Sequence, residues 1–593
     1  MKQPIFILIF CTCVLNASSQ FYLRGIVHDE KGKGLYNVKL QLYSKGTYPY
    51  YTGNSGAFGI PTSIPVDTIT LQSEGYETLK CAVDANKFQS LTLKMLPANA
   101  RLNHLRLISV TKDKQDVKHD EIYYHGGESY SSLVENNFVD AEKFPQTGFA
   151  VNVDRASYSN IRRFLNNGAK VPPDAVRIEE MLNYFSFPGI NTNTSRQAFI
   201  GKTQLTSCPW NINNELLFIN LQAPSLNLDQ IPPTNLIFLI DVSGSMDQPN
   251  RLPLLKSAFK FLVNNLRTQD TVAIVVYGGA VGIWLQPTSG AKKREINDAI
   301  EKLEADGDTP GEAAIRTAYS LAERAFNHSA NNRVILATDG DFNVGQTTEK
   351  ELEDLISDHR QSGIFLTCIG VGMGNYKDSK LEALAKSGNG NFAYIDNLHE
   401  AEKVLVTEFT KTLYAVATDC YVGITFNPEM VKQYRLIGFD NKIDAIQDST
   451  SVLEGGEVGT GHSLMAVFEI EPTDKNIEAV TNEIKDDEIA TIKLQYKLPG
   501  QSNDELQKFP IKNDYIDISA ADSSVRFATA LVMFGELLKQ SGFAKNYSWN
   551  DISLLSRSAV NMHDYSQAEF LNMVEKAKKI YTPGKKKKKD EEQ

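Results

Sequence analysis

The feature that most constrains the fold of this sequence is a series of short apolar runs between residues 235 and 412. Each run has the length of a strand, and amphipathic segments separate the runs from one another. Runs of this kind are typical of strands that are buried on both faces, as in a parallel sheet covered by helices. The runs are residues 236–240, 272–276, 334–337 and 364–371.

The segment after the first run has the pattern of a helix that covers such a sheet. Between Arg251 and Leu266 the apolar residues recur at intervals of three and four, so they lie on one face of a helix. We therefore predict a doubly wound α/β domain over residues 235–412, within a multidomain protein that combines α/β and all-β parts. The apolar stripe consists of Leu255, Ala258, Phe259, Leu262, Val263 and Leu266.

Polar residues follow the predicted strands at the sheet edge where open α/β domains bind ligands. Asp241, Ser243 and Ser245 follow the first run on alternate positions, Thr309 stands just before a predicted helix, and Asp339 follows another run. Carboxylate and hydroxyl oxygens without Cys or His favour Mg²⁺, with Mn²⁺ as its relative. The sequence therefore predicts a metal site at these five residues.

The charges of this set favour binding over catalysis. Asp241 and Asp339 neutralise one divalent ion, and the hydroxyl ligands leave one coordination position for an acidic oxygen of a protein partner. A catalytic metal site would need a positioned base or a second metal, and the sequence defines neither. We expect the neighbouring acids to form a solvated rim and the protein not to be an enzyme. These acids are Asp306, Asp308, Glu312 and Asp341.

With these three loops in this order, the chain resembles the von Willebrand factor type A domain. Asp241, Ser243, Ser245, Thr309 and Asp339 match the metal-ion-dependent adhesion site of that family one by one. The resemblance implies a Mg²⁺ ion held partly through waters, with an acidic residue of a bound protein completing the octahedron. The chain departs from the family at position 308, where Asp replaces a frequent glycine, so repulsion of acidic partners would lower affinity more than metal binding.

The N-terminus predicts export. Residues 1–19 combine Lys2, an apolar run that is too short to span a bilayer and a small-residue stretch, which is the pattern of a secretory signal. We therefore expect an exported protein of the periplasm or cell surface of a bacterial envelope. The tail, residues 582–593, contains a lysine run from Lys585 that is expected to be solvated, with contact to anionic lipid as the alternative.

Residues 21–97 show short apolar alternations broken by Gly, Asn and Pro, which predicts a small all-β sandwich. The stretches Gly25-Ile26-Val27 and Thr52–Phe58, followed by Gly75-Tyr76, resemble the carboxypeptidase regulatory-like family. The resemblance implies a transthyretin-like accessory sandwich without catalytic power, in which Asn54 and Gly56 supply the turn. Residues 98–144 lack a sustained period and are interpreted as a linker.

The flanks of the α/β domain are predicted to be helices plus strands over residues 145–234, a β-rich domain over 413–520 and helices over 521–581. We expect the strands of 198–222 to pair with those after 412, so that the α/β domain is inserted in a β-sandwich. Asp154 and Ser566 are interpreted as caps of the helices that follow them. Parts of these flanks resemble a bacterial family of secreted or envelope type A domain proteins whose flanks have no known function; these parts are Asp154–Phe187, Cys208–Asn211, Tyr434–Gly438 and Phe527–Leu538.

Composition excludes one class of partner and leaves one crosslink open. The formal net charge of −11 provides no domain-wide basic footprint for nucleic acid. Cys368 lies inside an apolar run and is expected to be a buried small hydrophobe. Cys208 and Cys420 flank the central domain and could form a disulfide in an oxidising compartment.

Three functions compete at this point. The favoured one is a Mg²⁺-dependent protein-binding, adhesion or assembly module, and the second is a scaffold whose β domains make the contacts. The third is a hydrolase, for which His462 beside Ser463 is one polar cluster and the zinc-peptidase spacing His125-x-x-Glu128 is another. The hydrolase is disfavoured because the sequence lacks a Gly-x-Ser-x-Gly elbow and a suitably placed third zinc ligand.

Overall fold

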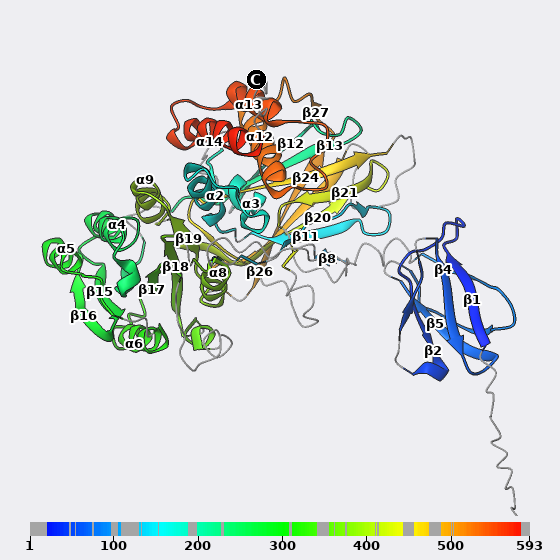
Figure 1. Cartoon of the computed structure of the whole chain (residues 1–593), viewed down its shortest axis with the longest axis horizontal. Helices are drawn as coiled ribbons and strands as arrows, with labels where there is room; N and C mark the ends of the chain where they lie inside the picture. The colour runs from blue at the N-terminus through cyan, green and yellow to red at the C-terminus, as the bar shows by residue number, and fades with distance from the viewer. Residues whose placement is uncertain are drawn as a thin grey trace, which may run out of the picture. The chain divides into compact units, whose positions relative to one another are not determined.

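The computed structural model describes residues 21–95, 105–107 and 128–582, apart from short internal gaps such as 188–198, 308–310, 341–354, 443–455 and 474–487. The chain divides into two compact units, Met1–His104 and Leu105–Gln593 (Figure 1). The predicted signal sequence and the lysine tail both lie outside the described residues. Among the described helices, none combines the length and apolar character needed to cross a bilayer.

The N-terminal unit is all-β, as its alternating pattern predicts. One sheet has the order β4-β1-β7 and the other β3-β2-β5-β6, and their inward-facing residues form one core. Gly56 has φ +78°, and a Cβ there would lie 2.2 Å from the Val27 carbonyl oxygen, so the turn requires glycine. The family resemblance of this unit stays a prediction. Its strands are β1 (Phe21–His28), β2 (Lys39–Leu42), β3 (Tyr50–Tyr51), β4 (Ala57–Thr62), β5 (Val66–Gln72), β6 (Leu79–Asp84) and β7 (Gln89–Thr92).

The second unit contains the predicted α/β sheet, with strand order β16-β15-β14-β17-β18-β19. All neighbouring strands are parallel except β16, which runs antiparallel to β15. The first strand, β14, lies between β15 and β17, so the order reverses at its carboxyl end, where open α/β sheets bind ligands. The strands are β14 (Thr234–Asp241), β15 (Thr271–Gly278), β16 (Ala280–Ser289), β17 (Asn331–Thr338), β18 (Ile364–Val371) and β19 (Phe392–Ile395).

Helices cover both faces of this sheet (Figure 1). Leu236, Phe238 and Ile240 of β14 pack in one cluster with α4, α5 and α9. The alternate residues Ile237 and Leu239 pack in another cluster with α6 and α8. Because β14 is buried on both faces, its sequence is continuously apolar. The helices are α4 (Leu252–Asn265), α5 (Lys293–Glu301), α6 (Gly311–Arg324), α8 (Asp378–Ser387) and α9 (Leu398–Glu402), followed by the π-helical turn η6 (Lys403–Thr407).

The two flanks of the α/β domain form a β-sandwich, as predicted. Strand β13 from before the domain pairs with β24 from after it over eight residues, from Glu215↔Ile470 to Gln222↔Ser463. The sheets have the orders β10-β21-β24-β13-β12-β27 and β26-β25-β20-β11-β8, with β23 beside β20. The α/β domain is therefore an insertion between paired strands. The remaining strands are β8 (Leu105–Leu107), β9 (Leu133–Val134), β10 (Val139–Asp140), β11 (Gln146–Ala150), β12 (Ile200–Ser207), β13 (Glu215–Gln222), β20 (Ala415–Phe426), β21 (Val431–Ile437), β22 (Asn441–Lys442), β23 (Gly456–Gly459), β24 (Ser463–Pro472), β25 (Glu488–Lys497), β26 (Asp504–Lys512) and β27 (Tyr515–Ile516).

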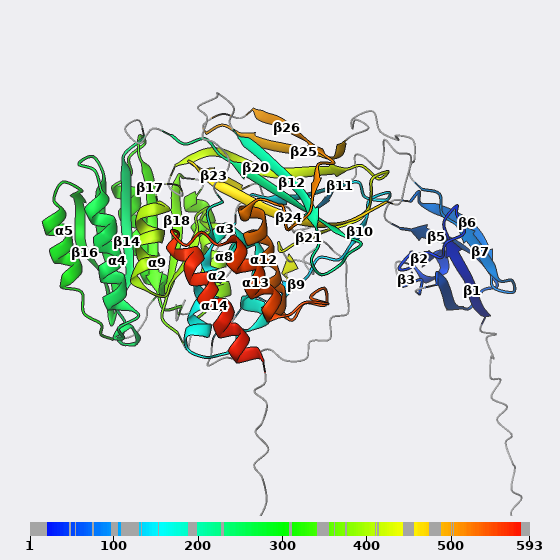
Figure 2. The same ribbon diagram turned by 90° about the horizontal axis from the view of Figure 1, so that it is seen from above.

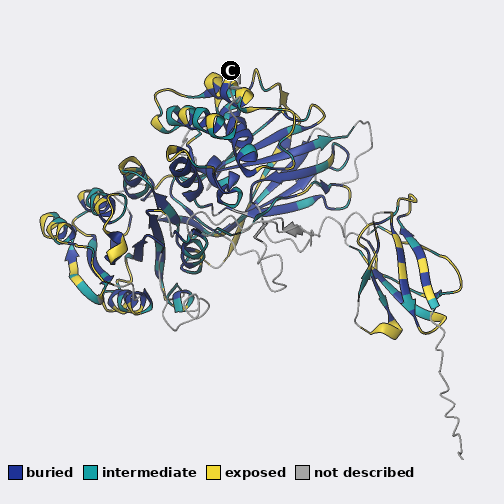
Figure 3. Ribbon diagram, viewed as in Figure 1, coloured by how far each residue is buried: buried dark blue, intermediate teal, exposed yellow. Residues whose placement is uncertain are grey.

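A layer of helices covers the outer face of the β13–β24 pair (Figure 2). Leu216 and Phe218 of β13 face these helices, whereas Leu217 and Ile219 face the sandwich interior, so this sheet is buried on both sides (Figure 3). The helices are α2 (Ala156–Asn166), η3 (Pro173–Ala175), α3 (Ile178–Tyr184), α12 (Ser523–Lys539), α13 (Trp549–Ala559) and α14 (Tyr565–Tyr581).

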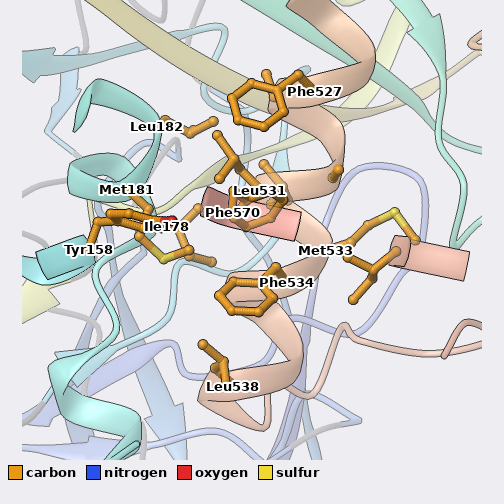
Figure 4. Close-up of a cluster of buried hydrophobic side chains, with 14 of the residues drawn as sticks. Tyr158, Ile178, Met181, Leu182, Phe527, Leu531, Met533, Phe534, Leu538 and Phe570 are labelled. Carbon is orange, nitrogen blue, oxygen red and sulfur yellow. The ribbon is translucent and has the colours of Figure 1, made fainter. Parts of the chain in front are cut away.

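Helix α12 is the centre of this layer. Phe527, Leu531, Phe534 and Leu538 lie along the side of α12 that faces Met181 and its neighbours on α3 (Figure 4). Phe534 is fully buried and meets Phe570 of α14 edge to face, with 5.1 Å between the ring centroids. This apolar stripe is therefore the contact surface that joins α3, α12 and α14.

A buried arginine joins the helical layer to the α/β domain. Arg162 of α2 is fully buried, and its Nε donates to Asp396 Oδ2 at 2.8 Å. Its Nη2 donates to Glu400 Oε2 of α9 at 2.7 Å, and its Nη1 to Glu569 Oε2 of α14 at 2.9 Å. One guanidinium thus connects three segments that are far apart in the sequence.

One local prediction is wrong, one crosslink that the sequence left open is not found, and one prediction is confirmed. Residues 128–144 are not part of a linker: Glu128 is buried against Arg163, and β10 pairs with β21. Cys208 and Cys420 are free thiols in two different hydrophobic clusters, on opposite sides of one sheet of the sandwich. Cys368 is buried, as predicted.

The predicted helix caps also differ. Asp154 accepts a hydrogen bond from the Phe392 backbone N–H at 2.9 Å and does not cap α2. Asp564, not Ser566, caps α14 by accepting from the Gln567 N–H at 3.1 Å. Glu569, further along α14, binds Arg162. For Asp154, a tertiary contact engages the side chain that local spacing had assigned to a cap.

We expect Phe534→Ala to lower the free energy of unfolding by about 3–5 kcal/mol, because it leaves a cavity among aromatic rings. Urea denaturation followed by tryptophan fluorescence measures the loss. The control Leu554→Ala, at a position that is 72% exposed on α13, should change stability by less than about 0.5 kcal/mol. Equal effects of the two substitutions would contradict the assigned core.

Arg162→Met should cost about 3–5 kcal/mol at pH 7, because Asp396 and Glu400 would stay buried without their cation. The loss should be smaller at lower pH, because burial already raises the pKa of Asp396 and protonation removes its unpaired charge. The control Arg294→Met removes an arginine whose side chain is 96% exposed and should cost less than about 1 kcal/mol. A loss that does not depend on pH would assign the effect of Arg162 to packing alone.

Candidate metal centre

The predicted site residues that the structure describes lie at the carboxyl ends of β14 and β17. Asp241 is the last residue of β14, and Ser243 and Ser245 follow it in the loop and the 3₁₀ turn η5 (Gly244–Met246). Asp339 comes directly after β17, which is the parallel neighbour of β14. Because parallel neighbours end at the same edge of a sheet, these two loops are adjacent. Thr309 lies outside the described residues.

Hydrogen bonds from the neighbouring loop and strand hold Asp241 in place. The Ser243 backbone N–H donates to Oδ1 at 2.9 Å, and the Thr338 hydroxyl donates to Oδ2 at 2.9 Å. Burial raises the pKa of the Asp241 carboxyl to about 6, and the nearby Asp339 acts in the same direction, while the bonds from Ser243 and Thr338 oppose them. The carboxylate is therefore positioned but costly to ionise, and a cation beside it would relieve that cost.

The two serine hydroxyls lie at a spacing that suits an octahedral ion. Ser243 Oγ and Ser245 Oγ are 3.1 Å apart. Neighbouring oxygens around Mg²⁺, at bonds of about 2.0–2.1 Å, are about 2.9 Å apart. Ser243 is buried and Ser245 is exposed, so the pair reaches from the sheet edge to the surface. Two carboxylates and two hydroxyls fit the donor set of a hard divalent cation.

The loop that leads to Thr309 is tied to the first loop by backbone hydrogen bonds. The Gly244 N–H donates to the Gly307 carbonyl at 2.9 Å, and the Asp306 N–H donates to the Val242 carbonyl at 2.7 Å. Gly307 has φ +76°, and a Cβ there would lie 2.3 Å from the backbone of Gly279. Only glycine allows this approach. The backbone is therefore held next to the first loop up to residue 307.

Sequence reasoning missed Arg251, which comes just before α4. Its Nη1 lies 2.6 Å from Asp339 Oδ2, and Nη1 also donates to the Ser245 carbonyl at 2.6 Å. Arg251 stands one residue before the helix that follows the Asp-x-Ser-x-Ser loop. This position could have predicted the contact, because a long side chain there can reach back to the loop.

The residues quoted for hydrolase activity have other surroundings. Both carboxylate oxygens of Glu128 accept from Arg163, each at 2.7 Å, and His125 lies outside the described residues. Burial lowers the pKa of His462 to about 3, so its ring is neutral at physiological pH. His462 lines a cavity of only about 60 Å³, together with Lys403 and Glu408.

Asp241→Asn should remove a pH-dependent loss of stability. Since burial raises the pKa of Asp241 from 3.8 to about 6, the native state binds more protons than the unfolded state between these values, and stability falls as pH rises through this window. In chelator at pH 7 the variant should be more stable than the wild type, by up to about 3 kcal/mol.

Urea denaturation at pH 4 and pH 7 measures this effect. The control Asp247→Asn changes an exposed acid of the same loop and should keep the wild-type dependence on pH. If the wild type and Asp241→Asn lose equal stability between the two pH values, the assigned environment of Asp241 is wrong.

Comparison with known sequences and structures places the central domain in a known family of domains. Residues 235–407 match the von Willebrand factor type A domain, residues 125–218 match a model described as von Willebrand factor, and residues 411–580 match the C-terminal model of the uncharacterized protein YfbK. Inter-alpha-trypsin inhibitor heavy chain H2 of Mesocricetus auratus is 28% identical over 35% of this chain and 22% of its own length. The solved von Willebrand factor type A structure from Catenulispora acidiphila is 15% identical, with coverage of 64% of this chain and 90% of that chain and a TM-score of 0.39.

A match that spans most of both chains is to the uncharacterized protein YfbK of Escherichia coli (strain K12). The two are 37% identical over 470 residues, which are 76% of this chain and 81% of that protein. The alignment thus extends well beyond the α/β domain alone. This chain, with its type A domain and its YfbK-type C-terminal domain, belongs to the YfbK family.

Proposed function

We propose that the central domain binds a protein partner through a divalent cation, Mg²⁺ or Mn²⁺. Asp241, Ser243, Ser245, Thr309 and Asp339 hold the ion, and an acidic residue of the partner supplies the last ligand. One observation carries this proposal: two buried carboxylates and two hydroxyls 3.1 Å apart meet at the switch point of the sheet. The partner is a protein, not nucleic acid.

The family match supports a role in protein interaction. Residues 235–407 match the type A domain, which is generally a module of protein–protein interaction and adhesion. The hydrogen bonds of the site also support binding over catalysis. Asp241 accepts bonds from Ser243 and Thr338, and Asp339 is paired with Arg251, so neither carboxylate is arranged as a general base. These contacts support the proposal that the protein acts by binding and not as an enzyme.

The proposed setting is the bacterial envelope. The secretory pattern of residues 1–19 supports export, and the likeness to an Escherichia coli protein over most of the chain supports a bacterial context. In that setting the flanking sandwich and helical layer carry the binding domain. The N-terminal unit acts as a separate accessory module.

Mature wild-type protein, immobilised and exposed to envelope extract, should retain a partner in Mg²⁺ and release it in EDTA. Asp241→Asn should reduce capture to background, because the ion loses one of its two charged ligands. The matched control Asp247→Asn, at an exposed acid in the same loop, should capture as the wild type does.

Thermal unfolding would show that each variant is folded before capture is compared. Capture that persists in EDTA and in Asp241→Asn would overturn the proposal. It would assign the contacts to the flanking β domains, as in the scaffold alternative.

A further inference from the structure

Arg251 connects three loops at the carboxyl edge of the sheet. Its guanidinium contacts Asp339 after β17 and the Ser245 carbonyl after β14, both through Nη1 at 2.6 Å. Its Nη2 donates to the Met373 carbonyl after β18 at 2.8 Å. A positive charge is thus built into the proposed metal site, in contact with one of its two carboxylates.

The arginine is held in this position by packing. Only 14% of its side chain is exposed. Its stem crosses Gly372, which has φ +80°, and a Cβ at Gly372 would lie 2.6 Å from Arg251 Nε and 3.0 Å from its Cγ. Any larger residue at position 372 would displace the side chain, so glycine there maintains the charge at the site.

Arg251 changes the net charge of the site from the value that Asp241 and Asp339 alone would give. Asp241 and Asp339 contribute two negative charges and Arg251 one positive charge, so the local total is −1. A divalent cation in this site leaves a surplus of +1, and an acidic group of a partner cancels that surplus. Without the arginine, the cation alone would complete the neutralisation, and an added carboxylate would be in excess.

We propose that Arg251 is a charge-balancing residue that weakens binding of the divalent cation alone and makes cation and acidic ligand bind cooperatively. This inference rests on the proposed metal-dependent function. Because coupling between two ligands is reciprocal, an acidic ligand must tighten cation binding by the same factor as the cation tightens ligand binding. Acetate can therefore stand in for the acidic residue of the partner.

The test is a Mn²⁺ titration of the full mature protein, with free Mn²⁺ followed by electron paramagnetic resonance, in chloride and in acetate at equal ionic strength. The variants are Arg251→Met, which keeps the aliphatic stem and removes the charge, and Arg251→Lys, which keeps the charge. Asp241→Asn controls for Mn²⁺ bound elsewhere. In chloride, Arg251→Met should bind Mn²⁺ about tenfold more tightly than the wild type.

Acetate should tighten Mn²⁺ binding to the wild type and to Arg251→Lys about fivefold, and to Arg251→Met less than about twofold. Equal Mn²⁺ affinities of wild type and Arg251→Met, or weaker binding by Arg251→Met, would overturn the inference while leaving the metal site in place. If Arg251→Lys in chloride bound Mn²⁺ more tightly than the wild type by the same factor as Arg251→Met, the inference would also be overturned. The positive charge would then not be the cause of the weaker binding. Mn²⁺ binding by Asp241→Asn equal to that of the wild type would instead overturn the proposed function.

Discussion

The pairing of β13 with β24 is the interaction on which the second unit depends. It joins residues 215–222 to residues 463–470, with the whole α/β domain between them in the sequence. Both faces of the pair are buried, one in the sandwich and the other under the helical layer. Loss of this pairing would therefore expose two cores at once and would release both ends of the inserted domain. The α/β domain is held at two chain ends by one sheet, which restricts its freedom relative to its flanks.

Buried charges add a second constraint between the inserted domain and the helical layer. Arg162 binds Asp396 and Glu400 near the last helix of the α/β domain, and Arg177 binds Asp378 at the first residue of α8. Such networks are weak evidence for stability, since each charge must leave water. They do require one defined arrangement, because a shift of either partner would leave a buried charge without its counterion. The interface between domain and flank is thus specific in its geometry.

The candidate metal centre, in contrast, lowers the stability of the fold because it buries negative charge. Asp241 is fully buried, and Asp339 adds a second negative charge nearby, so ionisation of Asp241 is disfavoured. Hydrogen bonds from Ser243 and Thr338 offset part of that cost, and the guanidinium of Arg251 pairs with Asp339. The paired strands β14 and β17 tolerate this cost in free energy because they are buried on both faces. Electrostatic strain of this kind is common where a binding site must keep charges ready for a ligand.

The sequence by itself determined the elements whose pattern is local and repeated. The apolar runs of the α/β sheet and the stripe of α4 follow from continuous burial and from the helical period of 3.6. The order of these runs also places the loops that carry Asp241 and Asp339 at one edge of the sheet. Only the tertiary structure decided which long polar side chains meet. Arg251 at Asp339, Arg162 at three carboxylates and Asp154 at the Phe392 backbone join residues that are distant in the chain. Apolar periodicity shows which face each segment must bury, so the buried faces can be predicted from the sequence. Charged side chains are flexible, and packing of the whole fold decides which partners they meet, so their partners cannot be predicted in this way.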